Sequence, residues 1–141
     1  MISIKDYFNE VLIELELCES KMEKLQLVLE YSKDLEEFPI TSKIKENEVP
    51  GCTSNVFIDC FKQKDGTIEF KATSDALIVG GYIAILFEGI NDRKPIEILE
   101  NWNVILDFTK KAGIKESLTI TRANAFSNIL NIIFKKVENF K

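Results

Sequence analysis

The feature that most constrains this fold is the run from Ala76 to Phe87, in which every residue is apolar or glycine. Ser74 before it is a suitable helix cap, Asp75 suits the first helical position, and Gly89 suits the end of the helix. A helix that is apolar on all sides must be covered by other elements. The segment therefore predicts a central helix, in which Gly80–Gly81 allow another element to approach closely.

Helices are predicted on both sides of this segment, from apolar residues at helical spacing and from residues that start helices. These starting residues are Ser3, Ser20, Pro95 and Thr121. The first two begin amphipathic helices in the N-terminal third of the chain. Pro95 begins a short helix over 96–99, a second short helix covers 104–111, and Thr121 caps a long final helix.

A β-hairpin is predicted immediately before the central helix. Residues 56–61 are rich in β-branched and aromatic side chains, residues 64–66 form a turn, and apolar residues alternate with polar ones from Ile68 onward. Residues 36–51 show no periodicity and are predicted to be a long irregular loop, a type of segment that often carries function. The chain is thus predicted to be one α+β domain over 1–141, with a small antiparallel sheet, centred on the hairpin 54–73, packed against several α-helices.

Charge and residue types exclude several classes of function. The formal net charge is −5, and residues 1–50 hold 12 acidic residues against 6 lysines, which argues against a nucleic-acid partner. The chain has no histidine, so Ser-His-Asp and Cys-His sites and most zinc sites are excluded within it. We therefore predict no metal site.

The cysteines and the N-terminus bear on location. The three cysteines are an odd number without CxxC spacing, which favours reduced thiols in a cytoplasmic protein. The N-terminus has the pattern of an amphipathic helix rather than of a secretory leader, and the apolar run is shorter than the roughly 20 residues of a membrane span. We expect a cytoplasmic protein without a membrane partner.

Three thiols are candidates for chemistry. Cys18 follows the first helix and Cys60 shares a strand face with apolar residues, so both are interpreted as small packing residues. Cys52 differs because Pro50 and Gly51 precede it in a turn that can present a side chain outward. The residues alone leave a second interpretation open, in which Cys52 packs beneath the loop and the loop docks a non-catalytic binding module on a partner.

Three blocks of the sequence resemble a known family. Residues 51–58, Gly-Cys-Thr-Ser-Asn-Val-Phe-Ile, look like the signature of the SufE family of sulfur acceptors, Gly-Cys-x-Ser-x-Val followed by an aromatic residue. Ser74-Asp75-Ala76 and the apolar residues after it resemble the family's second block. Leu118-Thr119 with Arg122 resemble the start of its last helix. The three blocks occur in the family's order and spacing, so the resemblance covers nearly the whole chain.

This resemblance implies a sulfur carrier rather than a stand-alone enzyme. Cys52 maps onto the family's acceptor cysteine, which takes persulfide sulfur from a SufS-like cysteine desulfurase and stimulates it. The chain would need no cofactor of its own, because the pyridoxal phosphate belongs to the desulfurase. The sulfur would pass to a SufBCD-like iron–sulfur scaffold or, alternatively, to a thiolation pathway. The implied fold is like that of the iron–sulfur scaffold proteins, but this chain lacks the cysteines and histidine that hold a cluster.

Four further residues are expected to support Cys52 or to bind the partner: Gly51, Ser54, Asp75 and Arg122. Arg122 can pair with a partner carboxylate or lower the pKa of Cys52, or it can be a solvated charge in the first turn of a helix. Asp75 can serve the site or only stabilise a helix dipole. The sequence leaves these alternatives open.

Overall fold

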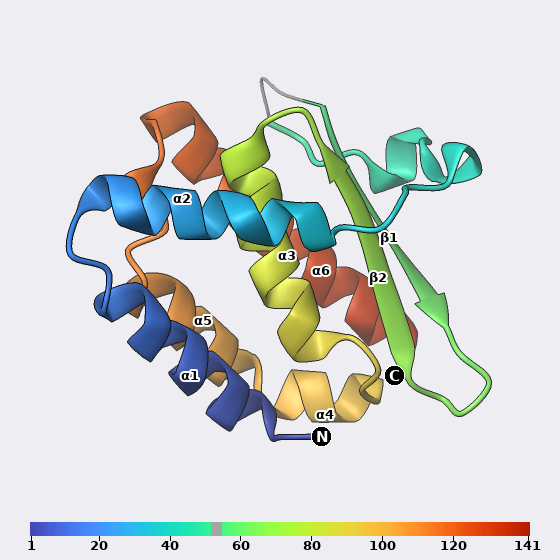
Figure 1. Ribbon diagram of the computed structural model, residues 1–141. Coiled ribbons are helices and arrows are strands. Elements are labelled where there is room, and N and C mark those ends of the chain that lie inside the picture. Colours follow the sequence, from blue (N-terminus) through green and yellow to red (C-terminus); the bar gives the residue numbers. More distant parts are fainter. Residues whose placement is uncertain (52–54) are drawn as a thin grey trace.

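A computed structural model describes residues 1–51 and 55–141 of the chain (Figure 1). Its α-helices surround a central helix. One β-hairpin (green) lies along one side of the molecule, and the connection between the first two helices (blue) lies on the opposite side. The helices and strands, in chain order, are α1 (Ile4–Glu16), α2 (Lys21–Tyr31), β1 (Val56–Lys62), β2 (Ile68–Ser74), α3 (Leu77–Ile90), α4 (Pro95–Glu100), α5 (Trp102–Lys111) and α6 (Ile120–Asn139). The predicted α+β architecture is confirmed.

The sheet of the described residues is the predicted hairpin. Strands β1 and β2 pair antiparallel from Val56 opposite Ser74 to Lys62 opposite Ile68. Burial alternates along both strands, so one face carries the apolar residues Val56, Ile58, Cys60, Ile68, Phe70 and Ala72. This face packs against α3 and α6.

Helix α3 forms the centre of the core, as its composition requires. Eleven of its residues are buried, and α2 crosses it closely. At the crossing, a Cβ atom on Gly81 would lie 2.2 Å from the backbone oxygen of Val28, so only glycine allows this approach. Gly80 has more room, since the nearest atom to a Cβ there would be Leu35 Cδ1 at 3.6 Å.

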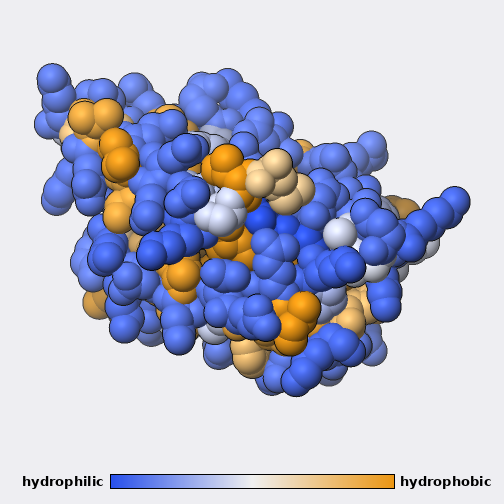
Figure 2. Space-filling model, turned by 90° about the horizontal axis from the view of Figure 1, so that it is seen from below, coloured by the Kyte–Doolittle hydropathy of each residue, from blue (hydrophilic) through white to orange (hydrophobic). Residues whose placement is uncertain are grey.

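The remaining helices close the core around α3. Helix α1 packs against α5 and α3, and α4 packs against α6. Two predicted caps are confirmed, since Ser3 Oγ accepts the N–H of Asp6 at 3.0 Å and Ser20 Oγ accepts that of Glu23 at 3.1 Å. Seen from below, the surface is mainly hydrophilic, and its apolar side chains form separate small patches (Figure 2). In the described part of the chain, no helix is long and apolar enough to cross a membrane.

The boundaries of α3 and α6 differ from the prediction in three respects, and α5 begins at Trp102 rather than at residue 104. Helix α6 is capped by Thr119 rather than Thr121, because Thr119 Oγ1 accepts the N–H of Arg122 at 3.4 Å. Helix α3 continues past Gly89 to Ile90, and Gly89 is instead a point of close packing against α1. The helix begins one residue after Ala76, which is its N-cap without a side-chain bond, so neither Ser74 nor Asp75 caps it.

Candidate functional site

The structure describes the surroundings of the predicted site rather than its thiol. Gly51, Asp75 and Arg122 are among the described residues, whereas Cys52 and Ser54 lie outside them. The site is therefore described through the segments that lead into and out of residues 52–54.

These two segments are held together by backbone pairing. The N–H of Val49 donates to the carbonyl of Val56 at 2.9 Å, and Glu48 forms an antiparallel bridge with Phe57. Val49 and Val56 are both buried. The chain thus enters and leaves the 50–55 segment at adjacent points at the start of β1.

On the entry side, α6 contacts the Pro50–Gly51 turn. The side-chain amide of Asn128 donates from Nδ2 to the carbonyl oxygen of Pro50 at 2.8 Å. Gly51 has a φ of +78°, and a Cβ atom there would lie 2.9 Å from the same Nδ2. Glycine is therefore required at residue 51 both by the backbone conformation and by the neighbouring amide.

On the exit side, Asp75 contributes through its backbone. Its N–H donates to the carbonyl of Asn55 at 3.2 Å, and its side chain is exposed. This bond ties the start of β1 to the connection between β2 and α3. Because Asp75 precedes the helix cap, the predicted position at the start of the helix is wrong, and its contribution to the helix dipole is correspondingly reduced.

Arg122 lies in the first turn of α6 and is half-buried. It is on the same helix as Asn128, six residues before it, which corresponds to about 9 Å along the helix axis. A contact between Arg122 and Cys52 falls outside the described residues and stays a prediction.

A buried polar chain fixes the long loop before the site. Lys136 on α6 donates to Asn47 Oδ1 at 2.6 Å, and Asn47 Nδ2 donates to the carbonyl of Ser42 at 2.9 Å. Ser42 Oγ then donates to Asp59 Oδ2 on β1 at 2.6 Å. Asn47 and Ser42 are 3% and 5% exposed, so the bond between them is shielded from water and the other two are partly shielded. The loop, although irregular, is attached to both α6 and β1.

Of the two described thiols, Cys60 is not placed for reaction. Cys60 is buried in the sheet face, and burial raises the pKa of its thiol to about 12, with Asp59 adding to the rise and Lys136 opposing it. Cys18 is half-buried after α1, and its thiol donates to the carbonyl of Glu14 at 3.7 Å. The interpretation of Cys60 as a packing residue is confirmed.

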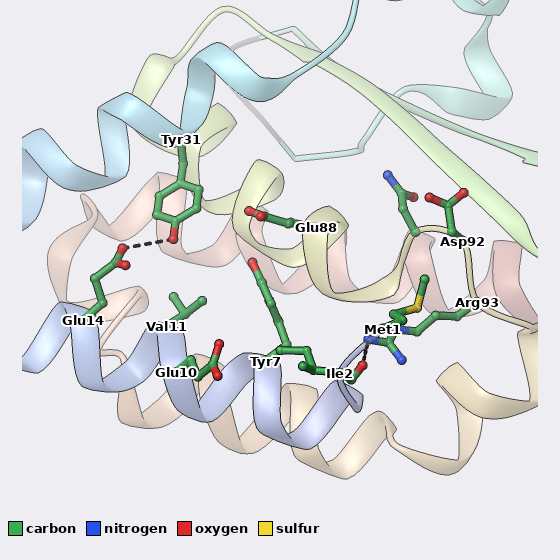
Figure 3. A pocket seen from close by; sticks show the side chains of 11 residues that line it. Met1, Ile2, Tyr7, Glu10, Val11, Glu14, Tyr31, Glu88, Asp92 and Arg93 are labelled. Carbon is green, nitrogen blue, oxygen red and sulfur yellow. Dashed lines mark hydrogen bonds between the residues drawn. The ribbon is translucent and has the colours of Figure 1, made fainter.

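A cavity of about 560 Å³ lies away from this site, between α1, the end of α2 and the end of α3 (Figure 3). Its wall includes Tyr7, Tyr31 and several carboxylates. Burial, followed by nearby carboxylates, raises the pKa of both tyrosines, so their hydroxyls stay protonated at neutral pH. Tyr31 donates to Glu14 at 3.0 Å and Tyr7 to the carbonyl of Ile85 at 2.7 Å. Among the described residues, those that line this cavity include no cysteine.

Three residues of this region, Asn128, Asn47 and Lys136, carry no signal in the sequence. Asn128 and Lys136 make their contacts across long stretches of chain, with 78 residues separating Asn128 from Pro50 and 89 separating Lys136 from Asn47. A polar residue on an amphipathic helix is by itself typical of a solvated face. Only the tertiary fold brings these side chains to the loop.

Comparison with known proteins agrees with this architecture and with the family resemblance seen in the sequence. Residues 9–137 match the family described as Fe-S metabolism associated domain, SufE. An uncharacterized SufE-like protein of Synechocystis is 36% identical over 118 residues, which cover 84% of this chain and 72% of that protein. The cysteine desulfuration protein SufE of Plasmodium falciparum is 34% identical over 78% of this chain, and the match spans only 45% of the Plasmodium protein.

A solved structure shows the same fold over almost the whole length of both chains. The solution structure of a hypothetical protein from Thermus thermophilus superimposes with a TM-score of 0.75, covering 99% of this chain and 98% of that one, at 20% sequence identity. The family match includes all the segments that surround residues 52–54, and the resemblance seen in the signature is confirmed. The chain belongs to the SufE family, the Fe-S metabolism associated domain.

Proposed function

We propose that this protein accepts sulfane sulfur on Cys52 from a SufS-like cysteine desulfurase, stimulates that enzyme, and passes the sulfur to a SufBCD-like iron–sulfur scaffold. The observation that carries the proposal is the family match over residues 9–137, which includes the Gly51-Cys52 signature. Homologues in this family are named cysteine desulfuration proteins. What we propose is the role of Cys52, the roles of its supporting residues and the identity of the two partners.

The properties of Cys60 support the choice of Cys52. The thiolate is the nucleophilic form of cysteine, and a pKa of about 12 leaves Cys60 almost wholly protonated at neutral pH. Cys18 is half-buried after α1, where its thiol donates to the carbonyl of Glu14 at 3.7 Å. By contrast, Cys52 directly follows Gly51, which has a positive φ, and the described segments on either side of residues 52–54 are paired with each other.

The proposed step is a thiol–persulfide exchange. The Cys52 thiolate attacks the outer sulfur of the desulfurase persulfide, a new S–S bond forms at Cys52, and the S–S bond of the donor breaks. The donor cysteine leaves as a thiolate, and the proton stays with the transferred sulfur, so there is no net oxidation. A thiolate of the acceptor protein then attacks the outer sulfur of the Cys52 persulfide, and Cys52 leaves as a thiolate. Within this scheme the pyridoxal phosphate and its chemistry belong to the desulfurase.

The supporting residues have distinct proposed roles. Gly51 sets the direction of the chain before Cys52. Ser54, two residues after Cys52, is the proposed supporting residue on the C-terminal side of the thiol. Asp75 holds the exit through its backbone bond to Asn55. Arg122 supplies a positive charge for a partner carboxylate or for the Cys52 thiolate. We place the relay in the cytoplasm, where thiols such as Cys60 stay reduced.

The test is to incubate the protein with a cysteine desulfurase and free cysteine and to measure the intact mass. One acquired sulfur adds about 32 mass units, and peptide mapping assigns it to Cys52. The matched variants are Cys52→Ser, which we expect to accept none, and Cys60→Ala and Cys18→Ser, which we expect to accept as the wild type does. Sulfur acceptance and desulfurase stimulation that persist in Cys52→Ser would overturn the proposal.

The destination of the sulfur needs a separate experiment. The persulfidated protein, freed from the desulfurase, is mixed with a SufBCD-like scaffold or with a thiolation acceptor, and the loss of the added mass is followed. We expect faster loss to the scaffold. Faster loss to the thiolation acceptor would retain the role of Cys52 and replace the proposed partner.

A further inference from the structure

We infer that Asn128 is a positioning residue for the acceptor thiol, because it fixes the turn of Pro50 and Gly51 that leads directly into Cys52. The inference rests on the proposed function, since it assigns Asn128 to sulfur transfer at Cys52. It adds a residue on α6 that the signature itself does not contain.

Asn128 is firmly held by its place on α6. It is half-buried and is followed by Ile129, which is 0% exposed, and by Leu130, which is 7% exposed. These neighbours anchor that turn of α6 in the core, so the backbone of Asn128 has a fixed position. A side chain on a core-packed helix places its polar group more accurately than one on a loop.

The amide of Asn128 restrains the turn before Cys52. Proline fixes its own φ and lacks an N–H, so its carbonyl is the hydrogen-bonding group that Pro50 offers. Asn128 Nδ2 donates to this carbonyl at 2.8 Å, an ordinary hydrogen-bond length. The bond restrains the peptide plane between Pro50 and Gly51, and the orientation of this plane sets the direction in which the chain continues toward Cys52.

Gly51 and Asn128 also fit each other sterically. The space that a side chain on residue 51 would occupy is filled by the amide nitrogen, at 2.9 Å from the Cβ position. An alanine there would displace the amide and break its bond to Pro50. The glycine of the signature is thus explained partly by a residue 77 positions away in the sequence.

Other contacts, rather than Asn128, attach the preceding loop to the fold. The polar chain from Lys136 to Asp59 attaches residues 42–47 to α6 and β1, and Val49 pairs with Val56. The bond from Asn128 is added at the last two residues before Cys52. There it affects the geometry of the turn more than the folding of the loop.

The experiment compares Asn128→Asp, Asn128→Ala and Asn131→Asp. Aspartate has the size of asparagine but has no N–H to donate, so it places a carboxylate against the Pro50 carbonyl. Asn128→Ala removes the bond without this repulsion. Asn131 is exposed on the same helix, which makes Asn131→Asp a matched control for charge. The rate of persulfide formation on Cys52 is measured against the concentration of each protein at fixed desulfurase, and thermal unfolding confirms that each variant is folded.

We expect the maximal rate to fall about two- to tenfold in Asn128→Asp and less in Asn128→Ala, as for the loss of one hydrogen bond. The concentration giving half the maximal rate should stay unchanged, because the contact with the desulfurase is retained. Asn131→Asp should match the wild type. A purely structural role lowers the melting temperature but leaves the maximal rate of the folded protein unchanged, and that outcome would overturn the inference while the proposed function stands. A wild type that accepts no sulfur on Cys52 overturns both.

Discussion

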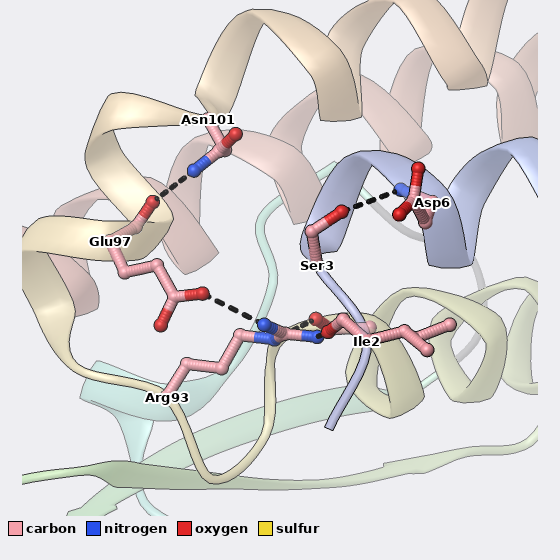
Figure 4. Close-up of polar contacts among 7 residues, drawn as sticks. Ile2, Ser3, Asp6, Arg93, Glu97 and Asn101 are labelled. Atoms are coloured by element: carbon pink, nitrogen blue, oxygen red, sulfur yellow. Dashed lines mark hydrogen bonds and ion pairs between the residues drawn. The ribbon is translucent and has the colours of Figure 1, made fainter.

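The two ends of α3 are held by different kinds of contact. At its C-terminal end, the guanidinium of Arg93 donates to the carbonyl of Gly89 at 2.8 Å, to Glu97 at 2.7 Å and to the carbonyl of Ile2 at 2.6 Å (Figure 4). Arg93 is only 5% exposed. One buried side chain thus joins α3, α4 and the N-terminal segment.

At the N-terminal end, single contacts hold the residues directly beside residues 52–54. Asn128 bonds to Pro50 and Asp75 bonds to Asn55, and both bonds lie at the surface. Each is about as strong as one ordinary hydrogen bond, whereas Arg93 makes several bonds from one charged group. The stronger polar contacts therefore lie at one end of α3 and the proposed chemistry lies at the other, as expected for regions that must yield to a partner.

Replacing Arg93 is expected to give the largest effect. Arg93→Ala removes three bonds and leaves Glu97 without its cation, which should reduce the free energy of unfolding by about 3 kcal/mol. Urea unfolding measures the loss. Arg93→Lys keeps the charge without the planar fork and should lose less.

The same variants test whether the contacts that stabilise one end of α3 are independent of the sulfur acceptance proposed at the other. Sulfur acceptance of the folded fraction should stay at the wild-type rate in both Arg93 variants. If acceptance fell in step with stability, or if Arg93→Ala lost less than about 1 kcal/mol, the two ends of α3 would not be separable as described.

The glycines of α3 provide a second test. A Cβ atom on Gly89 would lie 2.7 Å from ring atoms of Tyr7 and Phe8, which are buried, so Gly89→Ala should cost about 2 kcal/mol. Near the other end, Gly80 has ordinary clearance, so Gly80→Ala should gain about 0.8 kcal/mol from helix propensity. Thermal unfolding of the two variants gives the comparison. Equal losses of stability in the two variants would show that α3 is packed equally tightly at both glycines.

At the site itself, Gly51→Ala is expected to change function more than stability. Its φ of +78° costs an alanine about 1 kcal/mol, and its Cβ displaces Asn128. We expect a small loss in urea unfolding and a clear fall in the rate of persulfide formation. Gly66, also at positive φ but with open space around it, is the matched control, and Gly66→Ala should accept sulfur at the wild-type rate.

Local physics explains why much of the fold is predictable. Ser3 and Ser20 cap their helices because a serine oxygen needs only the N–H three residues later. The hairpin follows from alternation over a few residues. The sequence does not distinguish Thr121 from Thr119 because the two threonines have equal capping ability, and only the path of the chain after the preceding turn decides between them.

The site is predictable in part, for a related reason. Gly51 and Cys52 belong to a contiguous signature, so sequence alone can indicate them. Asn128 is brought to Pro50 by the packing of α6, and nothing near it in the sequence signals that contact. Gly89 likewise has the local features of a helix end, but the aromatic rings of α1 determine its actual role.

The smallest predicted effect concerns Glu88, near the C-terminal end of α3. Partial burial, followed by repulsion from Asp34, raises the pKa of this carboxyl above its ordinary value, although the nearby Tyr7 hydroxyl opposes the rise. Its charged form is therefore unfavourable in the folded protein. The stabilising effect of protonation is fully present below the unfolded pKa of about 4.3 and is lost as the pH rises through the higher folded pKa.

Glu88→Gln should thus be more stable than the wild type at neutral pH, by less than about 1 kcal/mol because solvent screens this exposed group. The advantage should shrink as the pH falls through the folded pKa of Glu88 toward the unfolded value. Urea midpoints of both proteins across this range measure it, and Glu10→Gln, at the same cavity, is the control. If the difference in stability between Glu88→Gln and the wild type grew on acidification, the pKa of Glu88 would be shifted in the opposite direction. If it shrank, a small electrostatic cost would be present even at the end of α3 that Arg93 stabilises.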